Sequence, residues 1–328
     1  MKKQYNEDGV VHLLAILLIV AVLGVTGFAG YKVMQSSKKD DPAASSNKNE
    51  ETTSKAVWTK GGFAIEGTYA DADIVQVNDT TWRLYYAIQP EVKGHNFEVY
   101  SATSSDGKTW KQDSGTRKTM ATFPEIVKLA DGRYRMYYQT AGVIKSAISS
   151  DGLSFTDESG TRVDTSNDAS LTFDNVAAPS VALKDDGTFI MVYRGTINER
   201  YATNTPNQTT QVLMWATSAD GLSFTQKGIA VDSRNTTLAG QLDGPDVVKF
   251  DDGYRVFATS YTGVYSFNFD GTTFAEAELA FAGEAKKVGD NYMGQPPGDP
   301  TTAKINGTWF MYYGATGKST GIHYATLQ

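Results

Sequence analysis

The stretch PEIVKLADGRYRMYY (124–138) decides the fold, because its pattern recurs along the whole chain. The other copies are ADIVQVNDTTWRLYY (72–86), PSVALKDDGTFIMVY (179–193), PDVVKFDDGYRVFAT (245–259) and PTTAKINGTWFMYY (300–313). Apolar and polar residues alternate on both sides of a turn, which is Asp-Gly or Asn-Gly in every copy but the divergent one at 72–86. This pattern predicts a β-hairpin in each copy.

A second hairpin follows each of the first four copies. Its sequences are YSATSSDGKTW (100–110), KSAISSDGLSF (145–155), MWATSADGLSF (214–224) and YSFNFDGTTF (265–274). Two hairpins per repeat give four antiparallel strands, and the repeats begin 52, 55, 66 and 55 residues apart. Four-stranded units at this period are typical of a β-propeller. The Asp residues of these Asp-Gly turns are explained by turn geometry and receive no catalytic role.

The two ends of the repeat region complement each other. The fifth repeat stops at HYATLQ, inside its third strand, whereas VWTKGGFAI (57–65) precedes the first repeat. Trp58 lies 14 residues before Ala72, as Trp110 lies 14 residues before Pro124. We therefore predict an all-β fold over 57–328, a five-bladed β-propeller closed by the N-terminal strand, which removes the free sheet edges.

The segment before the propeller is of a different kind. Residues 10–30, VVHLLAILLIVAVLGVTGFAG, are long and apolar enough for one N-terminal transmembrane helix, a signal anchor. We expect residues 1–9 to be a cytoplasmic tail and 31–56 a disordered linker, which places the propeller outside the cell at a single-pass membrane anchor. A cleaved signal peptide is the alternative.

Composition excludes several classes of function. The chain has 328 residues, a formal net charge of -7 and no Cys. The acidic balance argues against nucleic acid as a partner, because a phosphate backbone needs a basic surface. The absence of Cys excludes disulfides, thiol nucleophiles and thiolate metal sites. Five blades account for residues 57–328 and leave none for another domain. We also expect a monomer.

Carboxylates gather where the innermost strands of the blades begin. The loops on this face are long and differ from one another, as is usual around a binding site. The acidic residues concerned are Asp71, Asp73, Glu125, Asp243, Asp246 and Asp299. Since residues i and i+2 of a strand share a face, Asp71 and Asp73 are expected to point the same way. Crowded carboxylates raise one another's pKa, a condition for acid–base catalysis such as glycoside hydrolysis.

At these residues the chain resembles the five-bladed glycosidase superfamily, which includes glycoside hydrolase family 43 (arabinanase type) and family 32 (invertase and levanase type). The arabinanase pattern implies Asp71 as general base and Asp243 as general acid, with Ala72 replacing a Pro and Asp243 replacing a Glu. The third carboxylate of that pattern is absent, because Ala178 stands at its position. The invertase pattern would instead use Asp299, Asp71 and Glu125.

The resemblance implies a glycoside hydrolase that acts on an oligo- or polysaccharide through paired carboxylates, with no required cofactor and no catalytic metal. Our catalytic candidates are Asp71, Asp243 and Glu125. The substrate-binding candidates are Asp73, Asp246, Asp299, Arg194, His95, Tyr201 and Tyr292. Two alternatives stay open: a non-catalytic surface propeller that binds glycan or protein, and a propeller whose acids hold a structural Ca²⁺ in the central channel.

Overall fold

The computed structural model describes residues 57–89, 92–167, 172–201, 208–283, 286–288, 291–293, 297–315 and 320–328. The predicted tail 1–9, transmembrane helix 10–30 and linker 31–56 lie outside these residues. In the part of the chain that is described, no helix has the length and apolar character needed to cross a bilayer.

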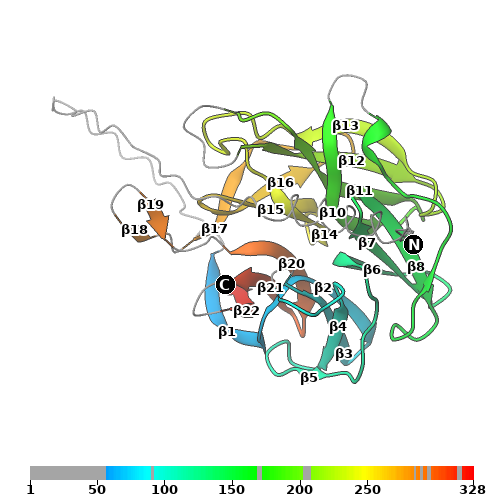
Figure 1. The fold of residues 1–328 in the computed structure, drawn as a ribbon. Helices are drawn as coiled ribbons and strands as arrows, with labels where there is room; N and C mark the ends of the chain where they lie inside the picture. The colour runs from blue at the N-terminus through cyan, green and yellow to red at the C-terminus, as the bar shows by residue number, and fades with distance from the viewer. Residues whose placement is uncertain are drawn as a thin grey trace, which may run out of the picture.

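Five four-stranded antiparallel sheets surround one axis (Figure 1). Blade 1 contains β2 (Tyr69–Asn78), β3 (Thr81–Ile88), β4 (Val99–Ser104) and β5 (Lys111–Gln112). Blade 2 contains β6 (Thr122–Lys128), β7 (Tyr134–Thr140), β8 (Val143–Ser149) and β9 (Thr156–Asp157). Blade 3 contains β10 (Phe173–Leu183), β11 (Phe189–Ile197), β12 (Thr210–Ser218) and β13 (Thr225–Val231). A short 3-10 helix (Thr165–Asn167) precedes β10.

Blade 4 contains β14 (Asp243–Phe250), β15 (Gly253–Ser260), β16 (Gly263–Phe269) and β17 (Glu278–Ala282). Blade 5 contains β20 (Gly298–Ile305), β21 (Thr308–Ala315), β22 (Gly321–Leu327) and β1 (Trp58–Glu66). The innermost strands β2, β6, β10, β14 and β20 contact one another in this order, and β20 contacts β2 again. The five-bladed all-β architecture is therefore confirmed.

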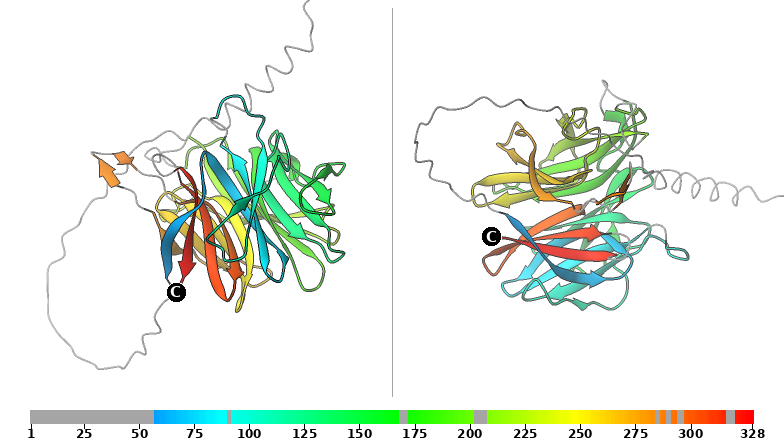
Figure 2. Two further views of the ribbon diagram at one scale, coloured as in Figure 1. Left: turned by 90° about the horizontal axis from the view of Figure 1, so that it is seen from below. Right: turned by 90° about the vertical axis from the view of Figure 1, so that its left-hand side faces the viewer.

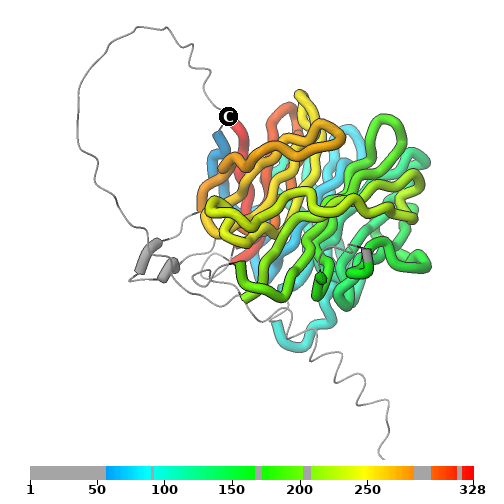
Figure 3. Tube along the Cα trace, turned by 90° about the horizontal axis from the view of Figure 1, so that it is seen from above, coloured from blue at the N-terminus to red at the C-terminus, as the bar shows by residue number. Residues whose placement is uncertain are grey.

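The predicted closure by the N-terminal strand is also confirmed. β1 pairs antiparallel with β22, from Trp58 opposite Leu327 to Glu66 opposite Gly321. Figures 2 and 3 show the blue β1 and the red β22 side by side. Trp58 is buried and packs edge-on against Phe257 of blade 4, with ring centroids 6.0 Å apart. The first strand thus completes the last sheet and also joins it to the neighbouring blade.

The repeated aromatic residues of the second strands pack between blades. Tyr85, Tyr137 and Tyr312 are fully buried. Their hydroxyls donate to carbonyl oxygens in the Asp-Gly turns of the next blade, at Gly152 (2.7 Å), Gly221 (2.8 Å) and Gly107 (2.7 Å) respectively. Val192 and Phe257 stand at the equivalent positions of blades 3 and 4 and have no hydroxyl. These hydrogen bonds therefore cross three of the five boundaries between neighbouring blades, which we call the seams. The aromatic pattern of the sequence therefore joins the blades to one another.

Three of the Asp-Gly turns share one set of hydrogen bonds. In blade 1, Asp106 Oδ1 accepts from the amides of Lys108 and Thr109, and Ser104 Oγ accepts from Gly107 N. The same bonds recur at Asp151 and Asp220. The interpretation of these Asp residues as turn formers is confirmed.

The outermost strands of blades 1 and 2 are shorter than the sequence suggested. β5 and β9 have two residues each. The chain then turns inward, because Asp113 accepts hydrogen bonds from Arg83 and Ser101, and Glu158 accepts them from Arg135 and Ser146. A further hairpin that was not predicted, β18 (Lys286–Val288) and β19 (Asn291–Met293), lies in the last connection between blades.

The innermost strands begin earlier than predicted. We expected them to start at Ala72, Pro124, Pro179, Pro245 and Pro300, whereas each starts at least two residues earlier and is interrupted there by a bulge. The residue before each expected start has a left-handed backbone. These residues are Asp71 (φ 52°), Phe123 (49°), Ala178 (47°), Gly244 (51°) and Asp299 (47°). We call them the mouth positions, and the end of the channel that they surround the mouth.

Candidate active site at the mouth of the channel

Left-handed backbone is costly for residues other than Gly, about 1–3 kcal/mol each, and such strain gathers at functional sites. Four of the five mouth positions carry such a residue. A bulge turns the side chain of the extra residue away from the regular alternation of the strand. The five bulges therefore place one residue from every blade around a common opening, and four of these residues have a side chain.

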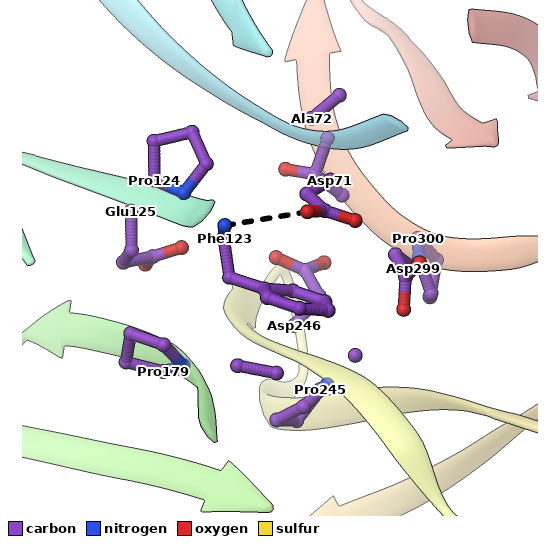
Figure 4. Close-up of a pocket in the computed structure, with 13 residues that line it drawn as sticks. Asp71, Ala72, Phe123, Pro124, Glu125, Pro179, Pro245, Asp246, Asp299 and Pro300 are labelled. Atoms are coloured by element: carbon purple, nitrogen blue, oxygen red, sulfur yellow. Dashed lines mark hydrogen bonds between the residues drawn. The ribbon is translucent and has the colours of Figure 1, made fainter. Parts of the chain in front are cut away.

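The mouth positions line a small cavity (Figure 4). Its walls also include the residue that follows each mouth position in the sequence. One residue farther along their strands, Glu125, Asp246 and Thr301 line it as well. The space that a water-sized molecule can occupy there is about 20 Å³, enough for about one water molecule. A sugar ring would therefore lie over this cavity and not inside it.

Asp71 is the best-buried carboxyl of the mouth positions, with 8 % of its surface exposed. Its Oδ2 accepts a hydrogen bond from Phe123 N at 3.4 Å. The pKa of Asp71 is raised to about 7: burial raises it most and the charge of Asp243 also raises it, whereas the Phe123 amide, Arg194 and a hydrogen bond with Asp299 lower it. Asp71 therefore gains and loses its proton near neutral pH.

Asp299 enters the mouth from blade 5, and its position depends on two residues of blade 4. Its amide donates to Thr259 Oγ1 at 3.0 Å. Gly244 leaves room for it, since a Cβ on Gly244 would lie 2.2 Å from Asp299 Oδ1. Burial and the negative charges of Asp71 and Asp243 raise the pKa of Asp299 well above its usual range. These influences favour the protonated form of Asp299.

Asp243 has a different electrostatic environment. Arg194 Nη1 donates to Asp243 Oδ2 at 2.5 Å, and Gly244 N donates to Oδ1 at 2.8 Å. The guanidinium of Arg194 also lies 5.9 Å from the centroid of the Phe123 ring. The mouth thus holds one carboxylate paired with an arginine, one carboxyl whose pKa is raised to about 7, and one whose pKa is raised well above its usual range.

A second ring of side chains joins the innermost strands. Ile126 N donates to Asp73 Oδ2 at 2.7 Å, Val181 N to Glu125 Oε1 at 2.7 Å, and Val247 N to Ser180 Oγ at 2.9 Å. Thr302 Oγ1 donates to Asp246 Oδ2 at 2.6 Å, and Thr301 Oγ1 donates to Asp73 Oδ1 at 3.3 Å. We call Asp73, Glu125, Ser180, Asp246 and Thr301 the inner ring. Each member bonds to the next blade, so the ring crosses all five seams.

Three inner-ring members are buried acids with few compensating charges. Burial raises the pKa of Asp73 to about 6 and that of Asp246 to about 8. Burial and the charge of Asp73 raise the pKa of Glu125 well above its usual range. These carboxyls hold the blades together through the hydrogen bonds above. The catalytic role predicted for Glu125 and the binding roles predicted for Asp73 and Asp246 stay predictions.

The expectation that Asp71 and Asp73 share a face was wrong. It assumed regular strand alternation, but the pairing of β2 with β3 shifts between Ala70 and Asp73. Asp71 consequently lines the mouth cavity, whereas Asp73 does not line it and bonds to the neighbouring blades.

The remaining predicted residues differ in position. Arg194 lies at the mouth, as described. His95 lies in the connection between β3 and β4, with Nδ1 3.2 Å from Glu98 Oε2, and does not line the mouth cavity. Tyr201 is half-buried and packs against Gly240. Tyr292 belongs to β19, and its side chain lies outside what the structure describes.

Sequence reasoning missed two residues of the mouth. Phe123 occupies the mouth position of blade 2, and Figure 4 shows its ring in the middle of the opening. Thr259 fixes the backbone of Asp299. Phe123 could have been found, because it aligns with Asp71 and Asp299 in the repeat. Thr259 gave no comparable signal.

The described residues contain no group of three or more His, Asp or Glu side chains arranged to hold a metal ion. The structural Ca²⁺ considered above stays a prediction.

Comparisons with known proteins bear on the fold. No protein-family model and no curated protein matches the chain. Among solved structures, a putative glycosidase from Bacteroides thetaiotaomicron is similar with a TM-score of 0.59 and 14 % identity, over 80 % of this chain and 87 % of that one. A thermostable family-43 glycoside hydrolase is similar with a TM-score of 0.58 and 14 % identity, over 83 % and 92 %. An α-L-arabinofuranosidase from Clostridium thermocellum has a TM-score of 0.55 and 16 % identity, over 77 % and 84 %. The chain thus shares the five-bladed fold of these glycosidases, and the resemblance predicted from the sequence is confirmed at the level of the fold.

Proposed function

We propose that this propeller hydrolyses a glycosidic bond at its mouth, with Asp71 as the central acid–base carboxylate. The proposal rests on the burial and the raised pKa of Asp71. Asp71 is a buried carboxyl whose pKa is raised to about 7, in the same opening as the ion pair of Asp243 and Arg194. Proton transfer is most effective when the group titrates near the working pH. The fold shared with glycosidases supports a glycan as the substrate class.

In the proposed reaction Asp71 acts as the base. It removes a proton from water, the water oxygen bonds to the anomeric carbon, and the bond to the leaving oxygen breaks. Hydrogen bonds from Phe123 N and from Asp299 favour the ionised form of Asp71 that this step needs.

Asp243 is the proposed acid, which gives its proton to the leaving oxygen. In the free protein Asp243 is held in an ion pair with Arg194. The proposal therefore requires that the bound glycan separates Arg194 from Asp243. Because Asp71 must be ionised to act as the base and its pKa is raised to about 7, turnover should fall as the pH drops below about 7.

The ion pair also supports a second candidate function, glycan binding without turnover. The pairing of Asp243 with Arg194 and the presence of Ala178 in place of a third carboxylate both weaken the case for a reaction. A matched pair of variants distinguishes the two functions. In an enzyme, Asp71→Asn and Asp243→Asn should each lower turnover by about 10²- to 10⁴-fold on the glycan that the wild type cleaves, with thermal unfolding unchanged. Unchanged turnover in either variant would remove that residue from the mechanism, and binding without turnover in the wild type would favour the binding propeller.

We further propose that residues 10–30 anchor the propeller to the cell membrane, with 57–328 outside. The apolar length of this segment supports the proposal. Protease added to intact cells should release the propeller, whereas a propeller protected until the cells are lysed would contradict this orientation.

A further inference from the structure

Asp299 was predicted to bind substrate or, in the invertase pattern, to be one of three catalytic carboxylates, but its surroundings indicate a different role. It stands at the mouth position of blade 5, as Asp71 stands at that of blade 1. Blades 5 and 1 are neighbours, because β20 contacts β2. Figure 4 shows both side chains at the same opening. The two carboxyls are close enough for a hydrogen bond between them to affect both groups.

Two residues of blade 4, Gly244 and Thr259, fix the position of Asp299. Gly244 cannot carry a side chain, since a Cβ would lie 2.6 Å from Asp299 Cα and 2.2 Å from its Oδ1. The hydroxyl of Thr259 accepts from Asp299 N and donates to Pro297 O at 3.2 Å. Blade 4 therefore holds Asp299 beside Asp71, through the space next to Gly244 and the hydrogen bond to Thr259.

The charges around the pair decide which carboxyl carries the proton. Asp243 adds a negative charge near both, and the positive charge of Arg194 acts on both. The acids Asp73, Glu125 and Asp246 belong to the inner ring and bond to neighbouring blades. Two adjacent carboxyls in such a place share one proton, because both cannot ionise at short range. The amide of Phe123 donates to Asp71 Oδ2 and so favours the ionised form of Asp71, which assigns the proton to Asp299.

We infer that Asp299 is a positioning residue, whose protonated carboxyl donates a hydrogen bond to Asp71 and holds it ionised and directed at the opening. The catalytic meaning of this contact rests on the proposed function. The arabinanase pattern implies a third carboxylate in blade 3, where this chain has Ala178. Here the supporting carboxyl comes from blade 5 instead, next to the base.

Two substitutions separate this role from a merely structural one. Asp299→Asn keeps a donor for Asp71, and Asn tolerates left-handed backbone well. Asp299→Ala removes the donor, and its backbone should persist because Ala178 has the same conformation at the mouth position of blade 3. The titration of Asp71 is followed by ¹³C NMR of the full chain labelled at its aspartate carboxyls, with Asp71→Asn assigning the signal.

In Asp299→Ala the loss of a hydrogen bond to a charged group should move the titration midpoint of Asp71 upward by about one pH unit. In Asp299→Asn the midpoint should stay within about half a pH unit of the wild type. Asp246→Asn is the matched control, a buried acid of the inner ring, and should leave the Asp71 signal in place. A midpoint that is unchanged in Asp299→Ala, or moved equally by both variants, would overturn the inference.

Activity gives a second readout. On a glycan that the wild type hydrolyses, Asp299→Ala should lower kcat/KM at pH 7 about tenfold and shift the lower limb of the pH profile upward with the Asp71 midpoint. Asp299→Asn should recover most of the rate. If the wild type cleaves no glycan, the proposed function fails, while the NMR titration still decides whether Asp299 controls Asp71.

Discussion

At the scale of single residues, the mouth combines strained backbone with buried acids. Each mouth position takes a left-handed conformation, and the residue type found there then decides what the blade contributes. Asp71 and Asp299 supply carboxyls, Phe123 supplies a ring, and Ala178 supplies no functional group. Gly244 is small because the side chain of Asp299 occupies the neighbouring space.

The close approach of Asp299 to Gly244 gives a prediction. Gly244→Ala should destabilise the domain by about 2–4 kcal/mol, since it adds overpacking to the cost of left-handed backbone. Gly132→Ala is the matched control, because Gly132 also has a positive φ (86°) but no atom within 4 Å of an added Cβ. The control should cost about 1–2 kcal/mol. Urea denaturation measures both, and equal losses would show that Asp299 does not occupy the space beside Gly244.

The sequence predicted which acids gather at the mouth but not how they are arranged. The repeat alignment placed Asp71, Asp243 and Asp299 correctly near one opening. It could not reveal the bulges, because the residues at the mouth positions have no common type. It also could not pair Arg194 with Asp243, which lie 49 residues apart, or show that Asp299 contacts Asp71.

At the scale of elements, the blades are joined by polar contacts that recur with the sequence repeat. The buried hydroxyl of Tyr137 bonds to Gly221 O across the seam between blades 2 and 3. Tyr137→Phe should lower the free energy of unfolding by about 1–3 kcal/mol, because it leaves a buried carbonyl without its donor. Tyr100→Phe serves as the control, because the side chain is partly exposed and its hydroxyl makes no hydrogen bond within the described part of the chain; it should change the free energy of unfolding by less than about 0.5 kcal/mol. Equal unfolding midpoints in urea for the wild type and Tyr137→Phe would contradict this account of the seams.

The closing strand gives a second prediction at this scale. Trp58→Ala should destabilise the domain by about 3–5 kcal/mol, because it empties a buried aromatic site between blades 5 and 4. Deleting residues 57–66 should go further and expose the edge of β22, which invites pairing between molecules. Light scattering should then report aggregation, and a monodisperse deletion variant with cooperative unfolding would contradict the role of β1 as the closing strand.

The elements were the most predictable level. The alternation around Asp-Gly and Asn-Gly identified the hairpins, and the spacing of Trp58 identified the closing strand. The short strands β5 and β9 were not predicted, since they end where Asp113 and Glu158 turn inward to arginines of other strands. Such contacts between strands leave no periodic signal in the sequence.

At the scale of the whole molecule, the buried acids of the channel make stability depend on pH. The pKa of Asp73 is raised to about 6, that of Asp246 to about 8, and that of Glu125 in the same direction. A raised pKa means that the folded state binds more protons than the unfolded chain, so stability falls as pH rises. The contribution is complete below about pH 4, the unfolded value, and is lost as pH rises through about 6 to 8.

Thermal unfolding of the wild type should therefore give a higher Tm at pH 5 than at pH 8.5. Asp246→Asn should flatten this dependence, because it removes the acid with the raised pKa of about 8. Asp186→Asn, on an exposed turn, is the control and should leave the slope between pH 5 and 8.5 unchanged. A Tm that is constant or rises over this range would mean that the inner-ring carboxyls are not held protonated.

The central claim is that the mouth is where a glycan binds and reacts. The position of an oligosaccharide bound to the Asp71→Asn variant, determined by crystallography, tests it most directly. The account predicts a sugar ring over Phe123, with its glycosidic oxygen within hydrogen-bond reach of Asp243 and the substituted side chain beside the anomeric carbon. An oligosaccharide bound to the outer strands or the rim, with the mouth empty, would contradict it.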